Sequence, residues 1–208
     1  ASPSIVLRQV DATGWRPIPI RESVEAARTV IGVVSARPRI WGGVNGPDGP
    51  LTIMGVPQAG MPKALVNQMI QLPARGQAII GWGVLPGQSA GILQLSGSIS
   101  RNYQIIDRLP KKTSLFTHDL VLLNHEDAQQ LIGLPNGYAS DLAIDVFHED
   151  EQDAILSDLA AAFPWPVRCV TRRQNAGIYA GNLNRGRTHG AVTVIPALLA
   201  LCLLVAVN

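Results

Sequence analysis

The stretch Thr113–Pro135, TSLFTHDLVLLNHEDAQQLIGLP, contains the clearest secondary-structure pattern in the chain. Its apolar run, Leu120–Leu123, is typical of a buried strand. Asn124 then stands at a position that favours a helix N-cap, and Gly133 stands where a glycine commonly ends a helix. The stretch therefore predicts a buried strand that leads directly into a short helix.

Patterns on both sides of this stretch predict further strands and helices. Helical spacing follows Ser23, which is expected to act as an N-cap, and recurs over residues 150–163. The glycine-rich residues 42–50 predict a hairpin with a long loop. Because strands and helices do not alternate strictly, we expect an α+β domain of mixed sheets with packed helices. Short apolar runs typical of strands lie at residues 5–7, 33–34, 39–41, 51–56, 77–80, 91–95, 99–106, 142–147 and 167–171.

The composition is that of a folded protein with little charge. Of 208 residues, 47% are hydrophobic and 15% are charged, which argues against an intrinsically disordered chain. A net charge of +2 is too small to indicate nucleic-acid binding. The two cysteines cannot form a disulfide framework or a cysteine-rich zinc site. Composition alone therefore indicates no enzyme class.

Residues 190–207, GAVTVIPALLALCLLVAV, form a run without a charged side chain. A helix of this length covers about 27 Å, close to the roughly 30 Å of a bilayer's hydrocarbon core. We therefore expect residues 190–208 to be a transmembrane helix that is cut short, with a buried hairpin or helix as the alternative. The residues of the predicted span are Val192, Ile195, Pro196, Leu199, Leu203 and Val207, and a proline is tolerated in such helices.

Charge is unevenly distributed ahead of this run. No acidic residue follows Asp158, whereas residues 159–208 contain five arginines. Residues 172–189 are therefore predicted to be a basic connecting helix or hinge that contacts anionic lipid headgroups. By the positive-inside rule, such a flank would lie in the cytoplasm together with the body. The candidate coupling residues are Arg172, Arg173, Gly177, Gly181, Arg185 and Arg187.

Residues 1–171 remain as the α+β domain, which has room for two subdomains. Residue 1 is Ala, and the first residues lack the basic and apolar regions of a signal peptide. We therefore expect the chain to be part of a longer protein, with its domain beside a membrane.

One serine matches a catalytic pattern. Residues 87–91, GQSAG, read GxSxG around Ser89, with acids and histidines further along the chain. The nucleophile elbow of hydrolases requires a strand before this serine and a helix after it. Pro86 and the strand pattern at residues 91–95 do not fit that requirement. A glycine-rich loop is the favoured interpretation, and no catalytic, cofactor-binding or metal-ligating residue is predicted.

Cys169 has two interpretations. The neighbouring Arg168 would lower the pKa of its thiol and make it reactive. Val167 and Val170 instead favour a cysteine that packs in the core. The core interpretation is preferred, because a single cysteine in an apolar strand is more often structural.

The order of these elements resembles the FtsX-like permeases of ABC transporters, the group of MacB and LolC/LolE. Thr113–Pro135 is similar to a strand and short helix of that family, which precede a strand such as Asp141–Val146. Residues 33–41 and 51–56 resemble strands near the start of the family's domain. A domain, a basic stretch and then a span also resemble the large extracytoplasmic domain between the first two spans. The likeness covers most of residues 20–207.

The resemblance implies a permease subunit of the bacterial inner membrane, with its domain on the extracytoplasmic side. Such a subunit couples a cytosolic ATP-binding subunit to the export or release of lipophilic or peptide cargo. The implied partners include a second permease copy, a periplasmic adaptor and the lipid bilayer. The chain has one predicted span of the usual four and no Walker A motif, so ATP is expected on the partner subunit and no cofactor on this chain.

Two other functions remain open from the sequence. A tail-anchored binding or interaction protein without a transport role would explain the terminal span and its basic flank. A membrane-tethered hydrolase built on Ser89 is the other alternative. For the permease, a helix that continues from Arg172 into the span would carry motion to the domain, unless the glycines of residues 177–190 form a hinge.

Overall fold

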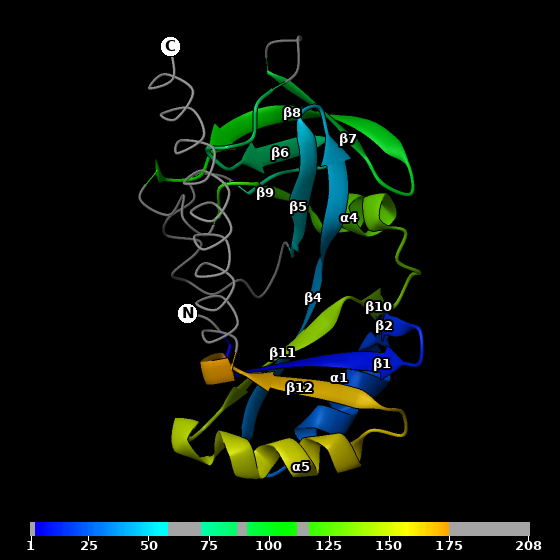
Figure 1. Ribbon diagram of the computed structural model, residues 1–208, viewed down its shortest axis with the longest axis vertical. Coiled ribbons are helices and arrows are strands. Elements are labelled where there is room, and N and C mark those ends of the chain that lie inside the picture. The colour runs from blue at the N-terminus through cyan, green and yellow to red at the C-terminus, as the bar shows by residue number, and fades with distance from the viewer. Residues whose placement is uncertain (1–2, 58–71, 87–90, 112–116, 175–208) are drawn as a thin grey trace, which may run out of the picture. The chain divides into compact units, whose positions relative to one another are not determined.

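The computed structural model describes residues 3–57, 72–86, 91–111 and 117–174 (Figure 1). The chain divides into two compact units, residues 1–169 and 170–208. Only residues 170–174 of the second unit are described, so the elements below belong almost entirely to the first. Within that unit, two groups of strands share the long strand β4 (Val33–Gly46).

The first group is a sheet with helices on one face, here called the sheet lobe. β1 pairs antiparallel with β11, and β11 pairs antiparallel with the first half of β4. β12 lies on the other side of β1, and its arrow runs opposite to that of β1 in Figure 1. The elements of the lobe are β1 (Ile5–Asp11), β2 (Gly14–Arg16), α1 (Ile20–Arg28), β11 (Asp141–Val146), α5 (Gln152–Ala162) and β12 (Val167–Thr171).

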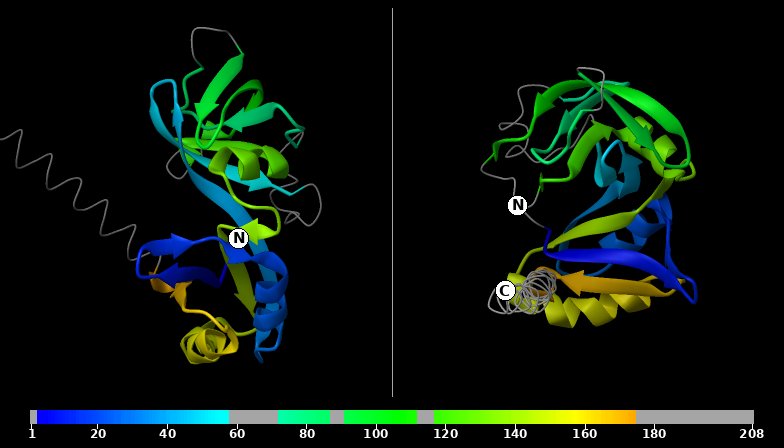
Figure 2. Two further views of the ribbon diagram at one scale, coloured as in Figure 1. Left: turned by 90° about the vertical axis from the view of Figure 1, so that its right-hand side faces the viewer. Right: turned by 45° about the horizontal axis from the view of Figure 1, so that its top comes forward.

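Side-chain alternation along these strands explains why the helices cover only one face (Figure 2). Leu7 of β1 lies opposite Leu142 of β11, and both are fully buried in the core that includes residues of α1 and α5. Arg8 and Asp141 are the next residues along each strand and therefore point to the opposite face. The helices thus pack on one face of the sheet, and the face that carries Arg8 and Asp141 is here called the uncovered face because α1 and α5 do not pack on it.

The second group closes into a barrel around its own core. Its strands follow the order β4-β5-β9-β6-β8-β7, and β7 pairs back to β4 at Ser96 and Asn45. α4 packs against β4 and β5 and contributes Ala128 and Leu131 to the barrel core. The added elements are β5 (Gly49–Val56), β6 (Gln77–Ile80), β7 (Ile92–Ser96), β8 (Ser100–Arg108), β9 (Leu120–Asn124) and α4 (His125–Ile132).

Three short elements complete the description. β3 (Ile18–Pro19) pairs antiparallel with β10 (Tyr138–Ala139) in a separate two-stranded sheet. The 3₁₀ turn η2 (Glu149–Glu151) precedes α5. The sequence patterns gave no indication of β2, β3 or β10.

The α+β class and the pattern at the centre of the chain are confirmed. β9 covers the predicted strand and leads directly into α4. The side chain of Asn124 accepts a hydrogen bond of 3.0 Å from the backbone N–H of Glu126, as an N-cap does. Gly133 ends the helix at a φ of 79°, a left-handed conformation that favours glycine.

Two local predictions are wrong. α1 begins at Ile20 after Pro19, so Ser23 is a buried residue inside the helix and not its N-cap. The expected long loop at residues 42–50 is a tight hairpin, because β4 continues to Gly46, which pairs with Gly49. The glycines of this segment therefore lie mostly within paired strands.

The predicted membrane segment lies outside the described residues, as do Gly177, Gly181, Arg185 and Arg187. Arg172 and Arg173 follow β12 at the start of a helical turn. No helix among the described residues is long and apolar enough to cross a membrane.

Candidate functional site

The candidate site lies where β4 passes from the sheet lobe into the barrel. Arg39 pairs in register with Asp141 of β11, and the next residue, Ile40, pairs with Gly55 of β5. The backbone N–H of Ser140 donates a hydrogen bond of 2.9 Å to the carbonyl oxygen of Arg39. A single strand therefore changes partners within one residue, and both groups of strands meet there.

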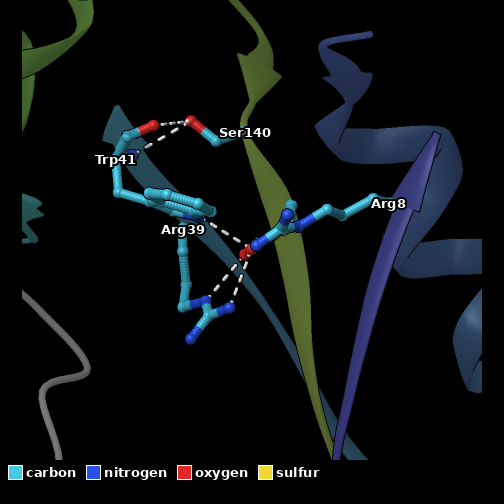
Figure 3. Close-up of polar contacts among 5 residues, drawn as sticks. Arg8, Arg39, Trp41 and Ser140 are labelled. Carbon is cyan, nitrogen blue, oxygen red and sulfur yellow. Dashed lines mark hydrogen bonds and ion pairs between the residues drawn. The ribbon is translucent and has the colours of Figure 1, made fainter. Parts of the chain in front are cut away.

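Ser140 holds the backbone of β4 just beyond this point (Figure 3). Its Oγ accepts a hydrogen bond of 3.0 Å from the Trp41 N–H and donates one of 2.6 Å to the Trp41 carbonyl. These two bonds take the place of strand pairing just before β11 begins at Asp141. The strand is thereby fixed at the position where it would otherwise be free to bend.

Asp141 is the centre of the junction, and its carboxylate is fully buried. Arg39 donates to both carboxylate oxygens, from Nε at 2.7 Å and from Nη2 at 2.8 Å. The indole Nε1 of Trp41 donates a third bond of 2.7 Å, and Arg8 Nε lies 3.5 Å away. Because its partners satisfy the buried charge, the carboxylate joins β1, β4 and β11 in one network.

Arg8 is held between two indole rings. The carbon Cζ of its guanidinium lies 4.6 Å from the ring centroid of Trp41 and 4.7 Å from that of Trp15. A second arginine, Arg168 of β12, lies 5.8 Å from the Trp15 centroid. Cation–π contacts of this kind stabilise a guanidinium over an aromatic face.

A second polar pair lies further along the same face of the sheet lobe. Asp145 accepts hydrogen bonds of 2.6 Å from Arg37 and 2.8 Å from Ser35. Its side chain is 34% exposed, in contrast to the buried Asp141. Of the two carboxylates, Asp141 therefore makes the buried ionic contact between the strands, and Asp145 makes a partly exposed one.

Among the described residues of the barrel, the one fully buried carboxylate is that of Asp127. Asp127 of α4 accepts a hydrogen bond of 2.7 Å from the Gly76 N–H and one of 2.9 Å from Arg101. Its side chain is 1% exposed. Asp127 thus attaches α4 to the start of β6 and to β8, which is a structural role within the barrel.

The catalytic alternative gains little from the described residues. Ser89 and three of its neighbours lie outside them, but β7 begins at Ile92, so a strand and not a helix follows the GxSxG segment. His125 begins α4, and burial lowers its pKa. Among the described residues, no group of His, Cys, Asp or Glu side chains could hold a metal ion.

Cys169 is a core residue of the sheet lobe. It packs against the helix-covered core, and burial raises the pKa of its thiol to about 11. The neighbouring Arg168 side chain is directed to the other face of the sheet, as alternation along β12 requires. The interpretation of Cys169 as a reactive thiol is therefore wrong.

Sequence reasoning missed the junction itself. Arg39 and Asp141 are separated by 102 positions and meet only through strand pairing. A signal was nevertheless present, because Arg37, Arg39 and Trp41 alternate along one strand and Asp141 and Asp145 lie on one face of another. Such alternation predicts polar faces, but it does not show which strands are neighbours.

The chain is similar to solved structures, but no protein-family model and no curated protein sequence matches it. The extracellular domain of the noncanonical ABC-type transporter YknZ from Gram-positive bacteria is similar with a TM-score of 0.49 and 10% identity, over 80% of this chain and 99% of that one. The periplasmic region of MacB from Actinobacillus actinomycetemcomitans is similar with a TM-score of 0.47 and 5% identity, over 85% and 92%. These structural neighbours are the class of domain that the sequence resembled.

Proposed function

We propose that the chain is the extracytoplasmic domain of an ABC-transporter permease and transmits motion from the membrane to partners or cargo outside it. The observation that carries the proposal is the position of β1 and β12. The Val10 N–H donates a hydrogen bond of 3.1 Å to the Pro166 carbonyl, so the end of β1 lies beside the start of β12. The start of β1 and the end of β12 are therefore neighbours at the opposite end of the pair.

This arrangement suits a domain inserted between membrane segments. The chain enters and leaves the folded unit through adjacent strands, so displacement of the flanking segments would move the whole sheet lobe together. The uncharged residues 190–207 and the basic residues 172–189 follow β12 in the sequence. We assign them the roles of membrane span and coupling segment.

The junction suits the transmission of motion. β4 runs through the sheet lobe and the barrel without a break, and the Asp141 network holds the point where it changes partners. A force on β1 or β12 would therefore reach the barrel through paired strands and buried polar contacts. In this proposal the domain acts as a rigid extension of the membrane segment, and a cytosolic ATP-binding subunit supplies the energy.

Labelling in intact cells tests the location of the domain. We would introduce Arg21→Cys on α1, where the native side chain is 85% exposed. A membrane-impermeant maleimide should label this variant in intact cells, whereas the partly buried Cys169, whose thiol pKa is raised to about 11 by burial, should give little background. Labelling only after lysis would contradict the proposal.

The same experiment tests the tail-anchored alternative. That alternative has one observation in its favour, because only basic charges lie between Asp158 and the apolar run. It predicts labelling of Arg21→Cys only after lysis. The permease predicts labelling from outside, so the two functions give opposite results.

Insertion of a flexible glycine–serine linker between residues 174 and 175 tests coupling. In the complete transporter, the linker should lower transport while ATP hydrolysis continues, because motion of the span would no longer reach the sheet lobe. Thr188→Ser, a conservative change in the same segment that adds no flexible residues, is the control. Full transport with the linker would contradict a mechanical role.

A further inference from the structure

We propose that Trp15, Arg8 and Arg168 form a binding site for the headgroups of anionic phospholipids on the uncovered face of the sheet lobe. This proposal rests on the proposed function, which places the lobe beside a bilayer. The three residues belong to β2, β1 and β12 and are here called the Trp15 site.

The three side chains converge on one face. Trp15 lies opposite Val10, and Arg8 is two residues before Val10, so both side chains point to the face away from the helices. The guanidinium carbons of Arg8 and Arg168 lie 4.7 Å and 5.8 Å from the Trp15 ring centroid. Trp15 is 52% exposed, so an aromatic edge remains available beside two cations.

The positive charge of this site is only partly neutralised. Among the described residues, Arg8 has one ion pair, the 3.5 Å contact with Asp141, and Arg39 already binds that carboxylate through two shorter bonds. Arg168 is exposed and forms no ion pair within the part of the chain that the structure describes. Of these two arginines on neighbouring strands, only Arg8 contacts a carboxylate of the described residues, and that carboxylate is already bound by Arg39, which favours an added anion.

The site is also ordered before any ligand arrives. Arg8 lies between the rings of Trp15 and Trp41, so it loses little conformational freedom when it binds a ligand. Guanidinium groups match the oxygens of a phosphate better than ammonium groups do, because they donate in a planar fork. The chemistry therefore fits a phosphate, as in phosphatidylglycerol.

An exposed tryptophan favours a lipid over an acidic protein as the source of that phosphate. Tryptophan is enriched where proteins meet the membrane–water interface, since its ring is apolar and its N–H is polar. In the proposed function, the 15 residues between Gln174 and Gly190 connect the lobe to the membrane span. Fully extended, they would reach about 50 Å, so the lobe stays within that distance of the bilayer. Tethering raises the effective concentration of headgroups, so a contact that is weak by itself becomes occupied.

The experiment uses the full chain reconstituted in phosphatidylcholine vesicles with or without phosphatidylglycerol. Lipids with a nitroxide on the headgroup quench tryptophans that lie at the interface. We expect quenching that depends on phosphatidylglycerol and disappears in Trp15→Phe. Trp82→Phe is the matched control, because Trp82 of the barrel is also 43% exposed and lies near two cations, Arg108 and Lys111.

Charge variants test the role of the arginines. Arg168→Gln should weaken the phosphatidylglycerol-dependent quenching roughly fivefold, the effect of about one basic charge near an anionic surface. Arg21→Gln on the helix-covered side removes the same charge and should leave quenching unchanged. Equal effects of the two variants, or quenching lost in Trp82→Phe and kept in Trp15→Phe, would overturn the proposal.

Flotation with neutral vesicles separates this proposal from the proposed function. A chain that floats with neutral vesicles but shows no quenching of Trp15 overturns the headgroup site alone. A chain that does not float with them loses its predicted anchor, and with it the proposed function. Polyglutamate that changes Trp15 emission, with no quenching by lipid, would assign the site to an acidic protein and overturn the lipid proposal.

Discussion

The sheet lobe and the barrel bury their apolar residues in different ways. The barrel returns to its first strand through Asn45 and Ser96, so its core is enclosed by its own strands and by α4. The sheet lobe has a core on one face only, where α1 and α5 cover it. In the closed barrel, the inward faces of all strands surround a single core. The open sheet has a second face, which carries polar and aromatic side chains.

This difference assigns separate tasks to the two regions. The uncovered face of the sheet lobe holds the Asp141 network and the Trp15 site, and the strands through which the chain enters and leaves the unit belong to the same lobe. The polar cluster of the barrel, around Asp127, instead makes contacts within the barrel and stabilises its packing. In the proposed function, forces from the membrane would enter at the sheet lobe, and the barrel would be the region that they move.

Asp141→Ala should have the largest effect on stability. It removes a fully buried carboxylate and leaves Arg39, Arg8 and the indole N–H of Trp41 without their acceptor, a loss of about 3–5 kcal/mol in the free energy of unfolding. Asp145→Ala is the matched change at the partly exposed pair with Arg37, and should lose about 1 kcal/mol or less. Denaturant unfolding of the full chain in detergent measures both. Equal losses would show that Asp141 is not the main contact.

Gly81→Ala should have the next largest effect, within the barrel. A Cβ at Gly81 would overlap the carbonyl oxygens of Thr117 and His118, which are backbone atoms that cannot rotate away. We expect a loss of about 1–3 kcal/mol in the free energy of unfolding. Gly43→Ala in β4 is the control, because no atom lies within 4 Å of the added carbon. A barrel that tolerates both changes equally would not be as closely packed at this turn as described.

Two residues that the sequence assigned as N-caps should now differ. Asn124→Ala should lower stability by about 1 kcal/mol, because it removes the acceptor for the Glu126 N–H in the barrel. Ser23→Ala in α1 should be neutral or slightly stabilising, since the buried Ser23 hydroxyl has no hydrogen-bond partner among the described residues. Thermal unfolding of both variants measures the contrast. If Ser23→Ala lowered stability to the same degree, the prediction that Ser23 is an N-cap would be supported instead.

Acid should produce a smaller effect through His125. Burial lowers its pKa in the folded state, so between that pKa and the usual value of about 6.5 the unfolded chain binds more protons. Stability is therefore complete above about pH 6.5 and decreases as the pH falls below it. His125→Asn should lose less stability than the native chain between about pH 7 and about pH 5. An identical pH profile would contradict a half-buried, neutral histidine.

The strands and the central helix could be predicted because their signals are local. Leu120–Leu123 and the caps at Asn124 and Gly133 lie within one short stretch, and each acts through its nearest neighbours. Ser23 shows the limit of such signals, because a serine before a helical pattern fits an N-cap and a buried helical position equally well. Pro19 could have corrected this, since the residues that follow a proline often begin a helix.

The junction and the barrel closure could not be predicted in the same way. The register of β4 with β11 brings together residues about a hundred positions apart, and the barrel closes through a pair of small polar residues in β4 and β7. Small polar residues at Asn45 and Ser96 carry no pairing signal of their own. Contacts of this kind depend on the order of all the strands, which one sequence does not define.

We propose that the sheet lobe and the barrel behave as one mechanical body through β4 and Asp141. Native-state hydrogen exchange of the full chain in nanodiscs tests it most directly, with amides of β11 reporting on the sheet lobe and amides of β9 on the barrel. If the two regions form one body, both sets of amides should open with the same free energy in the native chain. In Asp141→Ala, the β11 amides should open more readily than those of β9. Independent opening of the two regions in the native chain would contradict the claim.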